Sequence, residues 1–150
     1  MKLEEMTLDI EQHVDVKAPI AEVFKSMLYR LGEGNERPDG VPMQLALEPW
    51  PGGRWFRDRG NGVGHLWGHL QVIKPPVLLE LSGPMFMSYP VLNHVEVRLE
   101  EIEGGTRITL RHRAIGMLAR EHREGVKEGW GHLLQQVTGD MEKAGAGKKA

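Results

Sequence analysis

The stretch Glu121–Met141, EHREGVKEGWGHLLQQVTGDM, decides the fold of this 150-residue chain. Its apolar residues recur every three or four positions, which places them in one stripe along a helix of 3.6 residues per turn. They are Val126, Trp130, Leu133, Leu134, Val137 and Met141. Polar side chains, among them His132, Gln135 and Gln136, cover the other side. The pattern predicts a long C-terminal helix that buries one face against a large partner element.

Glycines are the unusual feature of this predicted helix. Gly125, Gly129, Gly131 and Gly139 each cost roughly 1 kcal/mol relative to alanine inside a helix. Gly125 and Gly129 are one turn apart beside Trp130. One interpretation is a helix held close to a concave surface or over a cavity; the other is ordinary core packing with incidental glycines. The sequence leaves both open.

The composition excludes several classes of function. The chain has no cysteine, which rules out disulfides, zinc–thiolate sites and a cysteine nucleophile. A formal net charge of -2 without a long basic run argues against nucleic acid as a partner. Residues 1–9 contain no apolar run, so we expect neither a signal peptide nor a membrane span, and a cytoplasmic location. No metal, cofactor or catalytic triad is predicted.

Upstream of the long helix, the hydrophobic period changes twice. Thr7–Val16 alternates as a half-buried strand, and a short amphipathic helix follows Pro19 and ends near Leu31. Residues 32–41 are rich in glycine and charge and indicate a loop. Six further runs have a period of two and are separated by Gly or Pro: Met43–Leu47, Arg54–Asp58, Gly64–Ile73, Leu78–Ser82, Asn93–Ile102 and Thr106–Ile115.

This order of elements predicts an α+β fold. A curved antiparallel sheet of about six to seven strands would wrap around the long C-terminal helix, because successive strands with short links form a meander. We expect one domain over residues 1–142 and a flexible tail at residues 143–150, which have nothing to bury.

Parity around the predicted Gly104–Gly105 turn assigns the faces of the last two strands. Charged residues occupy one face, and slipping the register by one residue would bury the arginines. Two polar residues then fall on the inner face, Asn93 and His112. A buried imidazole needs hydrogen-bond partners, so His112 is either a satisfied core residue or a cavity group that orients a ligand.

Five short motifs along the chain resemble one family. They are Ala18-Pro19 with Val23-Phe24, Pro51-Gly52-Gly53-Arg54, Gly68 with Pro75-Pro76 and Leu78, Gly105-Thr106 with Ile108-Thr109-Leu110, and Gly129-Trp130 with Leu133. Together they span roughly residues 7–140 and resemble the Hsp90-ATPase-activator-homologue branch of the START/Bet v 1-like (SRPBCC) superfamily. The resemblance implies a helix-grip architecture, often with an apolar cavity. One departure is Gly32–Asn35, where many members carry tryptophan.

Three functions are compatible with the resemblance, since fold does not fix function. The leading hypothesis is a protein that binds a hydrophobic small molecule between the sheet and the C-terminal helix. The alternatives are a co-chaperone-like module that binds a protein partner, and a cyclase or hydrolase acting on a hydrophobic substrate. We expect a monomer or a weak homodimer.

The candidate ligand-binding residues combine inward polar groups with soft apolar ones. They are Asn93, His112, Trp130, Met85, Met87, Trp67 and Val126. The sequence does not decide whether Trp67 and His69 face inward or outward. His65 and His69 are expected on one strand face about 13 Å apart, too far to share a metal ion.

Replacement of Trp130 by alanine tests the predicted burial of the long helix. Trp130 is central in the apolar stripe, and loss of a buried Trp typically costs ~3 to 5 kcal/mol. Denaturant melts of Trp130→Ala beside Val126→Ala should show the larger loss at Trp130. A loss below about 1 kcal/mol with ligand binding intact would contradict the placement of this helix against the sheet.

Overall fold

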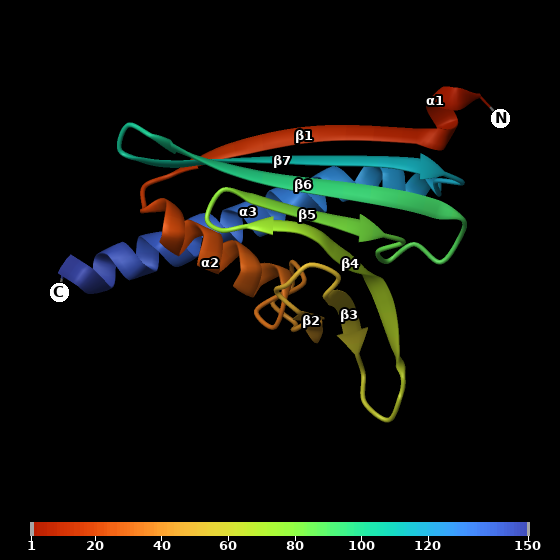
Figure 1. The fold of residues 1–150 in the computed structure, drawn as a ribbon, viewed down its shortest axis with the longest axis horizontal. Coiled ribbons are helices and arrows are strands. Elements are labelled where there is room, and N and C mark those ends of the chain that lie inside the picture. The colour runs from red at the N-terminus through yellow and green to blue at the C-terminus, as the bar shows by residue number, and fades with distance from the viewer. Residues whose placement is uncertain (1, 150) are drawn as a thin grey trace.

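Seven antiparallel strands form one curved sheet in the order β1-β7-β6-β5-β4-β3-β2, in a computed structural model that describes residues 2–149. The strands are β1 (Thr7–Val16), β2 (Leu45–Leu47), β3 (Arg54–Asp58), β4 (Gly64–Lys74), β5 (Leu78–Gly83), β6 (Val91–Ile102) and β7 (Gly105–Gly116). The helices are α1 (Leu3–Met6), α2 (Ile20–Leu31) and α3 (Arg120–Lys149). Helices α2 and α3 lie on the same face of the sheet, and α3 runs along it (Figure 1). This is the helix-grip arrangement that the sequence predicts.

The element bounds agree with the hydrophobic pattern, with two differences. Helix α1 was not predicted from the sequence. Helix α3 continues to Lys149, beyond Met141 where the apolar stripe ends. The expected tail at residues 143–150 is therefore helical up to Lys149. Its last residue lies outside the described residues. The flexibility of the tail stays a prediction. Within residues 2–149 no helix is both long and apolar enough to cross a membrane.

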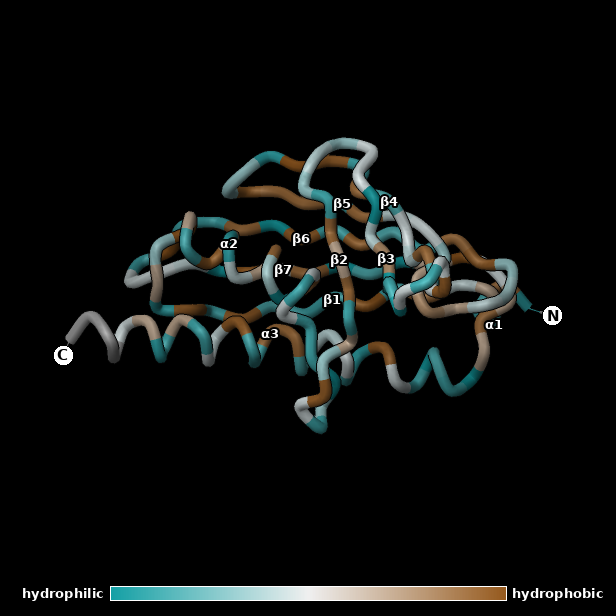
Figure 2. The backbone as a smooth tube through the Cα atoms, turned by 90° about the horizontal axis from the view of Figure 1, so that it is seen from below, coloured by the Kyte–Doolittle hydropathy of each residue, from teal (hydrophilic) through white to brown (hydrophobic). Residues whose placement is uncertain are grey.

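The core lies between α3 and the inner face of the sheet. Val95, Val97, Ile108 and Leu110 are buried on the sheet side, as their parity predicts. The α3 stripe is buried opposite them: Val126, Trp130, Leu133, Leu134 and Val137. Hydrophobic and hydrophilic residues alternate along the strands and along α3 (Figure 2). Gln12 of β1 donates from Nε2 to the carbonyl oxygen of Lys127 at 2.8 Å, which ties α3 to the sheet edge.

Two bulges on β4 bend the sheet. The register shifts at Trp55/Phe56 and at Leu70/Val72 leave Trp67 and Gln71 as extra residues on β4. An extra residue increases twist and shifts the alternation of faces. Trp67 is consequently buried while His69 is exposed.

The first bulge also corrects one expectation from the sequence. His65 pairs with Arg57 and His69 pairs with Arg54, two β3 residues of opposite parity. The two histidines therefore lie on opposite faces of the sheet, whereas the sequence predicted a shared face. Strand β4 also passes very close to β5, because a Cβ atom on Gly68 would clash with the carbonyl oxygen of Ser82.

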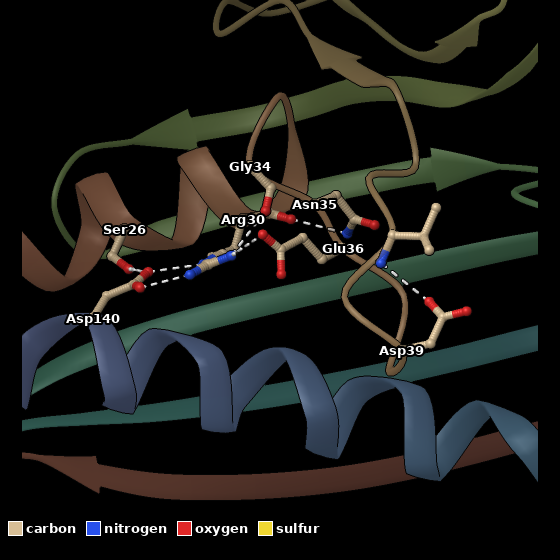
Figure 3. Close-up of polar contacts among 8 residues, drawn as sticks. Ser26, Arg30, Gly34, Asn35, Glu36, Asp39 and Asp140 are labelled. Atoms are coloured by element: carbon tan, nitrogen blue, oxygen red, sulfur yellow. Dashed lines mark hydrogen bonds and ion pairs between the residues drawn. The ribbon is translucent and has the colours of Figure 1, made fainter.

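A partly buried ion pair connects the two helices (Figure 3). Arg30 of α2 donates from Nε and Nη2 to the two carboxylate oxygens of Asp140 at 2.8 and 2.7 Å. Ser26 donates its hydroxyl to the same carboxylate at 3.0 Å. Arg30 also donates from Nη1 to the carbonyl oxygen of Gly34, and Asn35 donates to the carbonyl oxygen of Arg30. This cluster holds α2 on α3 and fixes the start of the loop that follows α2.

Replacement of Asp140 by alanine should destabilise the protein markedly. The Arg30 side chain is 15% exposed and would keep its charge without its main partner. Hydrogen bonds to charged groups contribute about 1.5 to 3 kcal/mol, so we expect a loss of about 2 kcal/mol in the free energy of unfolding, measured by urea melts. Asp39→Ala, which breaks the exposed pair with Arg37, is the control and should leave the midpoint unchanged. Equal midpoints for both variants would contradict a structural role for the Asp140 pair.

Candidate functional site

A cavity of about 210 Å³ lies between the N-terminal half of α3, the end of α2 with its following loop, and the β5–β6 loop. The sheet contributes Trp55 of β3 and Trp67 of β4 to its wall. The full lining is Leu31, Asn35, Glu36, Arg37, Pro38, Met43, Trp55, Trp67, Met85, Phe86, Gly125, Val126, Gly129, Trp130, His132, Leu133 and Gln136. Most of these side chains are apolar, so the cavity suits a hydrophobic molecule.

Aromatic rings form much of the cavity wall. Trp55 and Trp67 meet edge to face with ring centroids 5.2 Å apart, and Trp67 meets Phe86 in the same way at 5.6 Å. Trp55 donates its indole N–H to the carbonyl oxygen of Leu31 at 2.8 Å, a group that the end of α2 would otherwise leave unpaired. With its N–H group satisfied there, Trp55 needs no polar partner inside the cavity.

Gly125 and Gly129 lie on the exposed side of the cavity. A Cβ atom added at either position would have no atom within 4 Å outside its own helical surroundings. Close packing therefore does not require these glycines. Their absent side chains instead leave open space beside Val126 and Trp130, which is consistent with the cavity interpretation of the sequence.

Trp130 connects the cavity to a buried chain of hydrogen bonds. Its indole N–H donates to His112 Nδ1 at 2.9 Å. The Nε2 atom of His112 must then carry the proton, and it donates to Asn93 Oδ1 at 2.7 Å. Asn93 Nδ2 in turn donates to the carbonyl oxygens of Gly83 and Pro84. His112 and Asn93 are fully buried.

The structure divides the seven predicted ligand-binding residues into two groups. Trp67, Met85, Val126 and Trp130 line the cavity. His112, Asn93 and Met87 lie behind it, and the Asn93 amide also lies 3.6 Å from Met87 Sδ. Both ring nitrogens of His112 are engaged with other side chains. The geometry of this group matches the core interpretation of His112, and its contact with a ligand stays a prediction.

Several cavity residues were missed from the sequence. His132 and Gln136 belong to the polar side of the α3 pattern, yet both line the cavity. Each has a buried side-chain atom, His132 Nε2 and Gln136 Oε1, that has no hydrogen-bond partner among the described residues. The i, i+4 spacing of the two residues on one flank of the stripe is the signal that could have identified them.

His122, near the start of α3, lies in an aromatic contact with the β5–β6 loop. Its Nδ1 lies 2.8 Å from the Tyr89 hydroxyl, and its ring meets Phe86 edge to face at 5.0 Å. Tyr89 also accepts a hydrogen bond from the backbone N–H of Ala119 at 3.2 Å. These contacts fasten the β5–β6 loop, which carries Met85 and Phe86, to the start of α3.

The fold and the site together define a helix-grip protein with an apolar cavity under its C-terminal helix. The chain belongs to the family described as Activator of Hsp90 ATPase homolog 1-like protein, which matches residues 40–140. This confirms the resemblance seen in the sequence motifs. None of the curated proteins compared with the chain matches it.

Solved structures with the same fold are similar to this chain over most of its length. An uncharacterized protein from Rhizobium leguminosarum is 18% identical with a TM-score of 0.70, covering 91% of this chain and 95% of that one. The di-domain ARO/CYC StfQ from the steffimycin biosynthetic pathway is 11% identical with a TM-score of 0.68, and the match covers 96% of this chain and 53% of StfQ. CalU16 from Micromonospora echinospora is 24% identical with a TM-score of 0.55, covering 88% and 71%.

The stability of the protein should fall in mild acid because of His112. Burial, with a smaller contribution from nearby His94, lowers the pKa of His112 from 6.5 to about 4. Below pH 6.5 the unfolded chain binds a proton at this residue, and the folded chain does so only near pH 4. The contribution of neutral His112 to the free energy of unfolding is therefore complete above pH 6.5. As the pH falls toward 4, about 3 kcal/mol of it is lost.

Urea melts between pH 7.5 and 4.5 should show this loss, and His112→Gln, which cannot titrate, should flatten it. An NMR titration that gives His112 a pKa above 6.5 would contradict the assignment and indicate a nearby carboxylate.

Proposed function

We propose that this protein binds a small hydrophobic, aromatic molecule in the cavity between its sheet and α3. The observation that carries the proposal is the cavity itself, lined by Trp55, Trp67, Phe86 and Trp130. Rings of this kind offer large apolar contact area and preferred edge and face geometries for another ring.

The volume of the cavity limits the size of the bound molecule. A dry apolar cavity of about 150 Å³ is enough to bind benzene, and drug-sized ligands occupy pockets of about 300 to 1,000 Å³. At about 210 Å³ the cavity matches a molecule with one aromatic ring and a short substituent. Two proteins of the same fold, StfQ from the steffimycin biosynthetic pathway and DynU16 from the dynemicin biosynthetic locus, support a role with small molecules.

The alternative functions find less support in this geometry. An acid–base role for His112 would need a free ring nitrogen, and both are hydrogen-bonded to other side chains. An interaction module would need an apolar surface patch. Leu92 and Ile115 form an exposed cross-strand pair, but two side chains make a small contact area. The cytoplasmic location and a monomeric or weakly dimeric state stay predictions.

Filling the cavity from Gly129 should weaken ligand binding strongly without harming the fold. A leucine there would extend into open space beside Trp130, and leucine favours a helix by up to about 1 kcal/mol over glycine. Toluene is the probe, and tryptophan fluorescence is the readout because three of the four tryptophans line the cavity. We expect Gly129→Leu to weaken toluene binding by at least about 10-fold, since the two occupy the same space.

Gly139→Leu is the matched control for this experiment. Gly139 lies on the same helix with equally open surroundings but does not line the cavity, so toluene binding should be unchanged. If toluene binds Gly129→Leu as tightly as the parent protein, the cavity is not the binding site. Native mass spectrometry of freshly purified protein would show any molecule that co-purifies with it.

A further inference from the structure

Two residues that line the apolar cavity each have a buried polar atom with no hydrogen-bond partner among the described residues. These atoms are His132 Nε2 and Gln136 Oε1. The two residues are four positions apart on α3, so their side chains are neighbours on one face of the helix. A buried polar atom without a hydrogen bond is unfavourable, and a ligand that supplies the missing partners regains that interaction.

The chemistry of the two atoms selects the polar group of the ligand. The amide oxygen of Gln136 only accepts, so it requires a donor. The Nε2 atom of His132 donates in one neutral tautomer and accepts in the other. A hydroxyl group both donates and accepts, so one hydroxyl can donate to Gln136 Oε1 and accept from His132 Nε2–H. An ionised carboxylate only accepts hydrogen bonds, so its oxygens would be repelled by the amide oxygen of Gln136.

The charges around the cavity also disfavour an anion. Arg37 lines the cavity, but its guanidinium is paired with Asp39, with Nη2 2.6 Å from the carboxylate. Glu36, another lining residue, adds a negative charge and lies 3.8 Å from Arg30. Arg30 itself is neutralised mainly by Asp140. The described lining residues therefore offer an anion no cation that lacks a partner.

We infer that the cavity binds a neutral phenol, with its ring among the tryptophans and its hydroxyl between His132 Nε2 and Gln136 Oε1. This inference rests on the proposed function and specifies the ligand class for the same cavity. Trp55, Trp67 and Trp130 surround the ring, and the cavity volume admits one ring with a small substituent. The hydroxyl gives the ligand one orientation, with its polar end toward α3.

Three probes of nearly equal shape test the inference with the full chain at pH 7.5. They are toluene, p-cresol and 4-methylbenzoate, measured by isothermal titration calorimetry. We expect p-cresol to bind about 3- to 10-fold tighter than toluene, the range that one or two hydrogen bonds provide, and 4-methylbenzoate to bind most weakly. Gln136→Leu should remove the advantage of p-cresol over toluene. Gln135→Leu, an exposed neighbour outside the cavity, should behave as the parent protein.

The outcomes separate this inference from the proposed function. Equal affinity for toluene and p-cresol in the parent protein would overturn the phenol assignment while the cavity remains a binding site. Tightest binding of 4-methylbenzoate would overturn it in favour of an anionic ligand. If Gln136→Leu keeps the preference for p-cresol, the hydroxyl lies elsewhere, and the assignment is wrong. Failure of all three probes to bind would overturn the proposed function itself.

Discussion

Burial of the α3 stripe on the inner face of the sheet is the constraint on which the rest of the structure depends. Each large apolar side chain removed from water contributes about 1.5 to 3 kcal/mol, and α3 buries five in succession along its stripe, from Val126 to Val137. A helix of this length needs a concave partner to cover such a stripe. The bulges at Trp67 and Gln71 of β4 contribute that curvature. The cavity borders this bend, because Trp67, the extra residue of the first bulge, is one of its lining residues.

Besides the Gln12–Lys127 hydrogen bond, two sets of side-chain hydrogen bonds fix how α3 packs on the sheet and on α2. Near the middle of α3, Trp130 brings an indole N–H into the core, and the chain through His112 and Asn93 satisfies it. Further along, Arg30 and Asp140 hold the helix to α2. Hydrogen bonds are directional, so they specify how the helix is rotated about its axis and how closely it approaches the sheet. Hydrophobic burial is non-directional and does not determine either. Trp130 thus faces the cavity with its ring while its N–H group points away from it.

The sequence predicted the parts of this structure that follow from the local periodicity of apolar residues. Alternation placed the strands within a few residues, and parity correctly put Asn93 and His112 inside. It did not locate the bulge at Trp67, because a bulge is defined by the register of the strand against its neighbours, which one strand's sequence does not give. The faces of the sheet on which Trp67 and His69 lie could therefore be assigned only from the strand pairing in the structure.

The candidate site was harder to predict than the fold. Four of the seven ligand residues line the cavity, and the polar ones chosen by burial belong to the core network instead. His132 and Gln136 were assigned to the polar side of α3, because the helical pattern divides the residues into an apolar stripe and a polar remainder with no intermediate positions. In the structure the cavity widens past the apolar stripe and takes in the helix flank. The shape of a space between elements depends on loops such as residues 32–43, whose conformation no periodicity encodes.

The position of the glycines in α3 also gives the helix an uneven local stability. Gly125, Gly129 and Gly131 place three residues of low helix propensity within the part of α3 that borders the cavity, and the Arg30–Asp140 pair lies beyond it. Helical segments of weaker propensity open at a lower free-energy cost than the global unfolding of a domain. Amide hydrogens of the first turns of α3 should thus exchange faster than those near Val137. The wall that encloses the cavity therefore includes a helical segment of low intrinsic propensity, so local opening of α3 provides a route into the site.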